Sequence, residues 1–140
     1  MEFLKHNLDF MVFGTLGFMS FLMIWFVIER YLYFSRVNLN EFTDPDELQV
    51  ALSYRLTALS TIGANAPYIG LLGTVLGILI TFHDLGQGGR IEPAAIMLGL
   101  ALALKATAGG LVVALPAIFF YNALLRRIEV LMARWKRERR

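Results

Sequence analysis

The sequence contains no cysteine and only two histidines, His6 and His83, which stand far apart. Without cysteine the chain can form neither a disulfide framework nor a thiolate metal site, and the two histidines match no metal-ligand spacing. No nucleophile–base pair and no nucleotide motif is found, and the GQGG stretch is too short for a phosphate cradle. These absences predict no enzymatic activity, no metal and no cofactor.

Charge is also scarce: 17% of the 140 residues are charged and 57% are hydrophobic. The apolar residues come in three runs, which are Phe10–Ile28, Ala66–Phe82 and a longer one over Pro93–Tyr121. A transmembrane helix needs roughly 20 such residues. No small-residue cleavage site follows the first run, so we interpret it as a retained span rather than a signal peptide. The pattern predicts an all-α membrane protein with three transmembrane helices.

The basic residues predict the orientation of these spans. The segment 29–65 holds three arginines and the tail 122–140 holds seven Lys/Arg, whereas the N-terminus and the loop 83–92 hold only Lys5 and Arg90. Because basic residues accumulate on the cytoplasmic side, we expect a periplasmic N-terminus and a cytoplasmic C-terminus. The loop 83–92 reads as a short glycine-rich turn. A basic tail beside a membrane segment favours a cytoplasmic anchor over binding of nucleic acid.

The cytoplasmic segments are predicted to be helical extensions of the spans. Asp44 is a good N-cap and Pro45 suits the first helical position. No helix breaker follows until Gly63, so we expect one helix from about residue 45 into the second span. Pro93 should open a second helix that is kinked at Pro116 and continues into the tail.

Small residues recur on one side of the second and third spans. Helical spacing aligns Gly99, Ala103, Ala106, Thr107, Gly110, Ala114 and Ala117 in the third span, and Gly70, Gly73, Thr74 and Gly77 in the second. Such stripes allow two helix backbones to approach closely in lipid. Tight packing explains most of these positions. The two threonines could in addition offer hydroxyl groups to a polar path, although a lone membrane threonine usually bonds to its own helix.

Lys105 is a charge inside the third apolar run. A charge at mid-membrane costs at least ~2.5–3.5 kcal/mol, so it marks a functional or assembly site. It lies about 160° around the helix from Thr107, away from the small-residue face. The spans contain no acidic residue, and Glu29 and Glu92 stand at membrane edges. Lys105 must therefore face water, pair with a carboxylate from another chain, or lose its proton through desolvation, and we expect it to serve assembly or electrostatic tuning.

Two motifs resemble a known family. The stretch Asn65–Gly77 (NAPYIGLLGTVLG) is similar to the second-span motif, and Ala106–Ala117 with Tyr121-Asn122 is similar to the third-span motif, of the ExbB/TolQ/MotA family of proton-channel motor proteins. Glu29-Arg30 at the end of the first span also fits. The compact inner segment and brief tail resemble the short ExbB variants.

The resemblance implies a homo-oligomer, a pentamer, in the bacterial inner membrane, with spans two and three around a central pore. The pore would hold an ExbD-like single-span protein whose membrane aspartate carries protons. Proton flow would energise a TonB-like protein for uptake of iron-siderophores and cobalamin across the outer membrane. The family's two pore threonines map onto Thr74 and Thr107, near the partner's aspartate.

Leu102 marks a departure from the family pattern. Many members carry a membrane glutamate three residues after the glycine that here is Gly99, whereas this chain has Leu102 there and Lys105 one turn further on. A mechanism that needs a carboxylate on this subunit is therefore in question. Two alternatives stay open: a TolQ-like subunit of the Tol-Pal envelope system, and a structural membrane scaffold without a proton path, which would have no use for Lys105.

Overall fold

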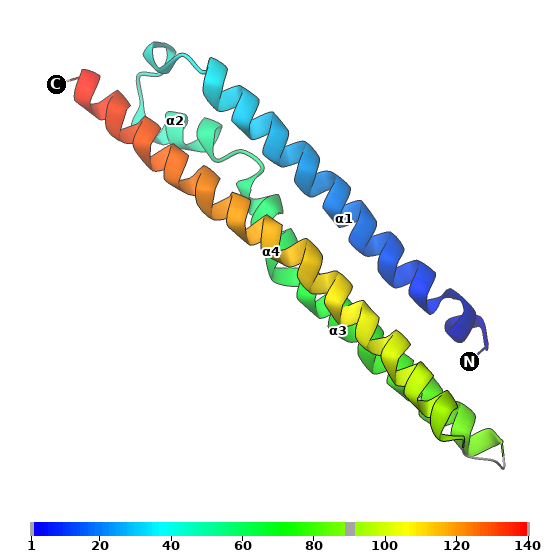
Figure 1. Ribbon diagram of the computed structural model, residues 1–140. Helices are drawn as coiled ribbons and strands as arrows, with labels where there is room; N and C mark the ends of the chain where they lie inside the picture. Colours follow the sequence, from blue (N-terminus) through cyan, green and yellow to red (C-terminus); the bar gives the residue numbers. More distant parts are fainter. Residues whose placement is uncertain (1, 89–91, 140) are drawn as a thin grey trace.

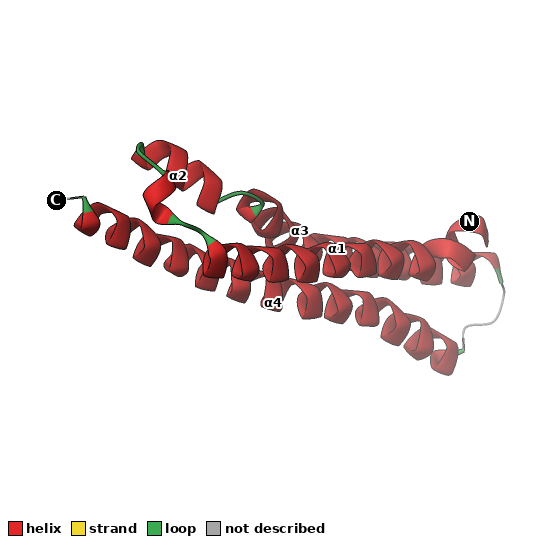
Figure 2. Ribbon diagram, turned by 90° about the horizontal axis from the view of Figure 1, so that it is seen from above, coloured by secondary structure: helices red, strands yellow, loops and turns green. Residues whose placement is uncertain are grey.

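The computed structural model describes residues 2–88 and 92–139, and the side chains within 7–88 and 92–139. These residues form the helices α1 (Glu2–Arg36), α2 (Pro45–Leu52), α3 (Leu56–Gln87) and α4 (Pro93–Glu138), with a short 3-10 turn, η1 (Leu39–Glu41), between α1 and α2. Figure 2 shows only helices and loops in this part of the chain. The predicted all-α fold is confirmed.

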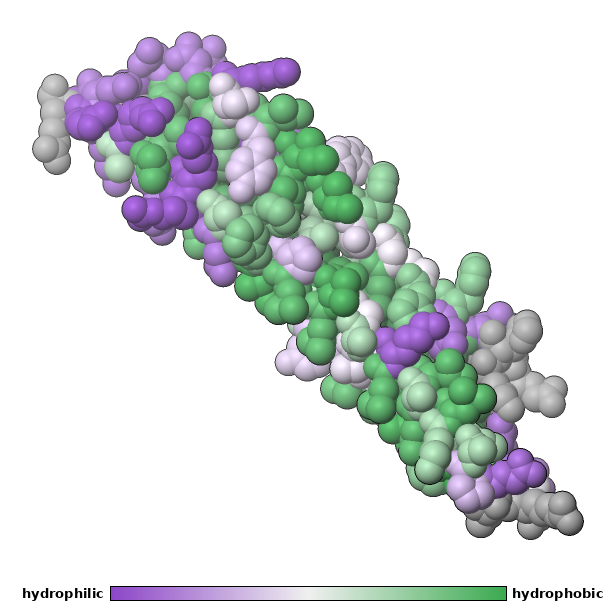
Figure 3. Space-filling view, viewed as in Figure 1, coloured by the Kyte–Doolittle hydropathy of each residue, from purple (hydrophilic) through white to green (hydrophobic). Residues whose placement is uncertain are grey.

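The three long helices form an elongated bundle. Figure 1 shows α3 side by side with the N-terminal part of α4, with α1 running beside them and α2 near the C-terminal end of α4. All three are long and apolar enough to cross a membrane, and 22% of the most apolar window of each is buried inside the chain. Figure 3 shows apolar side chains over the middle of the bundle and polar ones gathered at its ends. The exposed apolar faces must therefore be covered by lipid or by other chains.

Helix α4 has the predicted start at Pro93 and the predicted continuation past Pro116, whereas the kink expected at Pro116 stays a prediction. It begins with Pro93 at its first position and continues through Pro116 to Glu138. Proline lacks the backbone N–H that would bond one turn back, so the helix loses one hydrogen bond at Pro116 but is not ended there.

The segment after α1 is broken where one continuous helix was expected. Asp44 caps α2 by accepting a bond from the backbone N–H of Asp46 (3.3 Å), as predicted, but α2 ends at Leu52. A turn over 53–55 follows, in which Arg55 adopts a left-handed conformation (φ 72°). The turn lets α2 fold back against α4, where Leu48 and Leu52 are fully buried.

The connection between α3 and α4 is shorter than the predicted loop 83–92. Helix α3 passes Pro67 and continues to Gln87, so the first half of that segment is helical. Arg90 lies outside the described residues, and so does the side chain of Lys5, the other residue on which the predicted periplasmic side depended.

Candidate functional site: a threonine pair between two membrane helices

Thr74 of α3 and Thr107 of α4 meet between their helices. The two Oγ1 atoms are in direct hydrogen-bond contact. Thr74 Oγ1 also lies 2.8 Å from the carbonyl oxygen of Ala103 on α4 and 3.3 Å from that of Gly70 on its own helix. The shorter backbone bond thus crosses to the neighbouring helix, in contrast to the local bond that a lone membrane threonine usually makes.

Counting donors and acceptors limits the possible positions of the two hydroxyl hydrogens. Each threonine has one O–H donor and two acceptor lone pairs. When Thr74 donates to a backbone carbonyl, that of Ala103 or that of Gly70, Thr107 must donate to Thr74. When Thr74 instead donates to Thr107, the hydrogen of Thr107 is free to turn outward. The pair therefore has two hydrogen-bond arrangements, and the second offers a donor to a group outside the chain.

Exposure decides which hydroxyl a partner can reach. Thr74 is buried, with 7% of its surface exposed, whereas Thr107 is half-buried. Thr107 is therefore the more accessible residue of the pair, and Thr74 connects it to the backbone of α4.

The glycines of α3 and α4 bring the two threonines within reach. A Cβ atom added to Gly70 would lie 2.5 Å from the carbonyl oxygen of Ala106 and 3.0 Å from the Cα of Gly110. One added to Gly73 or Gly77 would lie 2.8 Å or 2.9 Å from a Cβ on α4. The two backbones therefore touch on either side of Thr74, and a larger residue at these positions would push the helices apart.

Three further predicted site residues lie along the same two helices. Gly99 packs against Thr81, to which an added Cβ would approach within 2.7 Å, and Ala114 is buried. Pro116 is half-buried inside α4.

Lys105 is separate from the threonine pair. Its side chain is exposed, and its ammonium lies 5.4 Å from the centre of the Phe13 ring on α1. Phe13 is near the start of the predicted span 10–28. Relative to α1, Lys105 therefore lies close to one end of the apolar stretch, although it is near the middle of the third apolar run.

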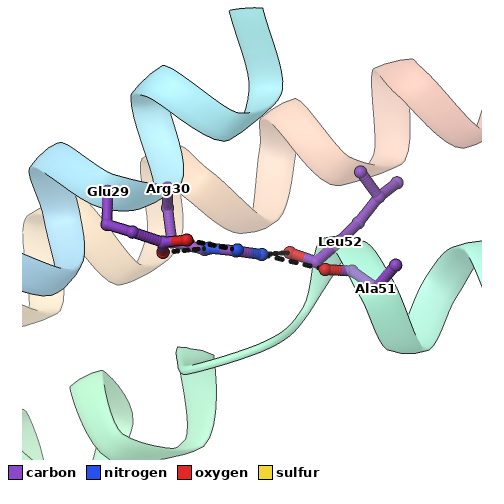
Figure 4. Close-up of polar contacts among 4 residues, drawn as sticks. All are labelled: Glu29, Arg30, Ala51 and Leu52. Carbon is purple, nitrogen blue, oxygen red and sulfur yellow. Dashed lines mark hydrogen bonds and ion pairs between the residues drawn. The ribbon is translucent and has the colours of Figure 1, made fainter. Parts of the chain in front are cut away.

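A buried arginine, for which the sequence predicted no structural contact, holds the segment between α1 and α3 in place. Arg30 is 3% exposed and forms a two-pronged ion pair with Glu29 (2.6 Å and 2.7 Å). Its Nη1 donates to the carbonyl oxygens of Ala51 (2.8 Å) and Leu52 (3.2 Å), as Figure 4 shows. The last carbonyls of a helix lack intrahelical partners and carry partial negative charge, so the guanidinium caps α2.

The α4 tail is tied to the same segment. The indole N–H of Trp135 donates to the carbonyl oxygen of Phe42 (3.1 Å), and the Arg139 guanidinium contacts that oxygen while stacking 4.6 Å from the Trp135 ring centre. Among the residues that the structure describes, no three His, Asp or Glu side chains are grouped to hold a metal ion.

Comparison with known proteins gives the family. A model of the MotA/TolQ/ExbB proton channel family matches residues 41–137. The biopolymer transport protein ExbB of Helicobacter pylori is 50% identical over 136 residues, which are 97% of this chain and 94% of that protein. ExbB of Aquifex aeolicus is 46% identical over 136 residues, with 97% and 92% covered.

A more distant match has another name. The Tol-Pal system protein TolQ of Pseudomonas aeruginosa is 37% identical over 117 residues, which are 73% of this chain and 51% of TolQ. The family model covers more than half of the chain, and the two ExbB proteins match it almost from end to end. The chain belongs to the MotA/TolQ/ExbB proton channel family.

Proposed function

We propose that this chain is the ExbB-type subunit of a proton-driven motor in the bacterial inner membrane, which energises TonB-dependent uptake of iron-siderophores and cobalamin. The observation that carries this proposal is the 50% identity to an ExbB protein over 97% of the chain. The match to TolQ is weaker, at 37%, and spans half of that protein. We therefore favour the TonB system over the Tol-Pal system.

The threonine pair is the proposed contact with the moving proton. A hydroxyl group does not titrate in the physiological range, so the proton must be carried by another group, for which we propose the membrane aspartate of an ExbD-like partner. The hydroxyl of Thr107 would bond to that carboxylate directly or through water, and Thr74 would exchange its bond between Thr107 and the Ala103 carbonyl.

The assembly that we propose is a homo-oligomer, a pentamer, with α3 and α4 around a central pore. Its N-terminus would be periplasmic and its C-terminus cytoplasmic. Large apolar side chains stay exposed on both helices of the pair, among them Leu72, Val75 and Leu104. They require a cover of lipid or of further subunits.

Shape-preserving substitutions test the proton path. Thr74→Val and Thr107→Val remove one hydroxyl each and keep the volume. Both should assemble normally but fail to support growth on siderophore-bound iron in a strain that lacks its own ExbB. Thr15→Val is the control, because Thr15 on α1 donates to the carbonyl of Met11 in its own helix (2.8 Å).

The outcomes separate the two roles of the threonines. Loss of growth with an unchanged complex mass would support the proton path. Normal growth of both variants would refute it and leave the threonines as packing residues. If the unmodified chain failed to restore this growth but rescued envelope constriction in a strain without TolQ, the Tol-Pal alternative would be favoured.

A further inference from the structure

Lys105 and Phe13 lie at the seam between α1 and α4, which is the line along which these two helices contact each other. The Phe13 ring enters this seam where α4 has no side chain: a Cβ on Gly109 would lie 2.8 Å from the Cε1 of Phe13. Lys105 lies one turn before Gly109, and its ammonium sits 5.4 Å from the centre of the same ring. A ring face attracts a cation but does not neutralise its charge.

Asp9 lies on the same side of α1 as Phe13. It precedes Phe13 by four residues, which is one helical turn, or about 6 Å along the axis. Asp9 and Leu102 line one groove of about 450 Å³ between α1, α3 and α4. Leu102 is one turn before Lys105 on α4. Asp9 therefore lies on α1 about one helical turn from the level at which the Lys105 ammonium contacts Phe13, beside the same line of contact between α1 and α4.

Both charges lack a neutralising partner within the described side chains. Neither Asp9 nor Lys105 takes part in an ion pair or a hydrogen bond there, and both are exposed. The other carboxylate of the groove, Asp84, belongs to α3 and has an interaction of its own. Attraction between opposite charges grows as the surrounding dielectric constant falls, and lysine has a long flexible stem that can redirect its ammonium.

We propose that Asp9 is the counter-ion of Lys105. In lipid, the ammonium moves from the Phe13 ring toward Asp9, and the resulting ion pair joins α1 to α4 at the end of the bundle that carries the N-terminus. The pair positions α1 on the rigid α3–α4 unit. This role is independent of the proposed proton path, because it involves neither threonine.

A double-mutant cycle tests the pair in the full chain, reconstituted in lipid nanodiscs. Asp9→Asn and Lys105→Met should each lower the midpoint of thermal unfolding by several degrees, because each leaves one charge uncompensated. The double variant should be no less stable than either single variant, and the exchange Asp9→Lys with Lys105→Asp should recover most of the loss. Asp84→Asn with Lys105→Met is the matched control, and its two effects should add.

The proposal is overturned if the effects of Asp9→Asn and Lys105→Met add, or if Lys105 couples to Asp84 instead. It is also overturned if Lys105→Met alone changes the mass of the complex, which would place the partner on another chain. If the charge variants do not fold, a covalent test replaces them. The sequence contains no cysteine, so Asp9→Cys and Lys105→Cys introduce the two thiols that react. A short thiol crosslinker should join them, and the linked protein should fold. No link between these positions would refute the pairing.

Discussion

The close contact of α3 and α4 predicts that Gly110→Ala is destabilising. A Cβ at Gly110 would lie 2.5 Å from the carbonyl oxygen of Ala66 and 3.0 Å from the Cα of Gly70. Both neighbours are backbone atoms, so neither can turn away as a side chain can. Ordinary contact begins near 3.4 Å, so the helices must separate by about 0.9 Å at this point.

Two opposing effects set the size of the loss. Alanine is favoured over glycine inside a helix by about 1 kcal/mol. Overpacking a tight interface costs about 1–3 kcal/mol, and a gap of about 1 Å forfeits up to half of the dispersion energy of nearby contacts. The same shift would stretch the Thr74–Ala103 bond from 2.8 Å to about 3.7 Å, beyond hydrogen-bond range. We expect a net loss of about 1–2 kcal/mol.

The measurement is thermal unfolding of the reconstituted protein, with complex mass as a second readout. Gly17→Ala is the control: it adds the same methyl group on α1, where nothing lies within 4 Å. It should leave stability unchanged or raise it by up to about 1 kcal/mol. Equal stability of the two variants would refute the argument that backbone contact at Gly110 holds α3 to α4.

Two further predictions concern the segment between α1 and α3. Arg30→Lys keeps the charge but loses the planar guanidinium that binds Glu29 and the α2 carbonyls. The backbone amides of residues 45–55 should therefore exchange hydrogen faster. An unchanged exchange rate would show that α2 docks without this cap. Trp135→Phe keeps an aromatic ring, though a smaller one, and removes the indole N–H that bonds to Phe42, which should cost about 1 kcal/mol and expose the 38–44 loop to protease. A loop as resistant as in the parent would contradict this role.

The membrane helices could be predicted because their signals are local. A long apolar run and an N-terminal proline suffice to place α4 from Pro93 through Pro116, and Asp44 and Pro45 mark the start of α2. Periodicity also put Thr74 and Thr107 on the small-residue faces of their helices. That the two hydroxyls touch depends on the register of α3 against α4, which the glycine contacts fix and which spacing within one helix cannot give.

The missed features depend on contacts between distant residues. The turn over 53–55 contains no proline or glycine, so nothing local marks it. It is stabilised by the Arg30 guanidinium, more than twenty residues earlier in the chain, and by the Arg55 side chain, which packs 5.0–5.3 Å from the ring centres of Trp25, Phe26 and Tyr54. The level of Lys105 relative to α1 likewise follows from how the helices are offset.

The backbone contact between Gly70 and Gly110 has a mechanical consequence. Two helices that touch through their main chains cannot slide or roll without a clash, so α3 and α4 act as one rigid unit. The hydroxyls of Thr74 and Thr107 then keep a fixed position along this unit and a fixed direction relative to it. Any movement in the proposed motor must therefore be made by a neighbouring element that moves relative to this unit, because α3 and α4 do not move relative to each other.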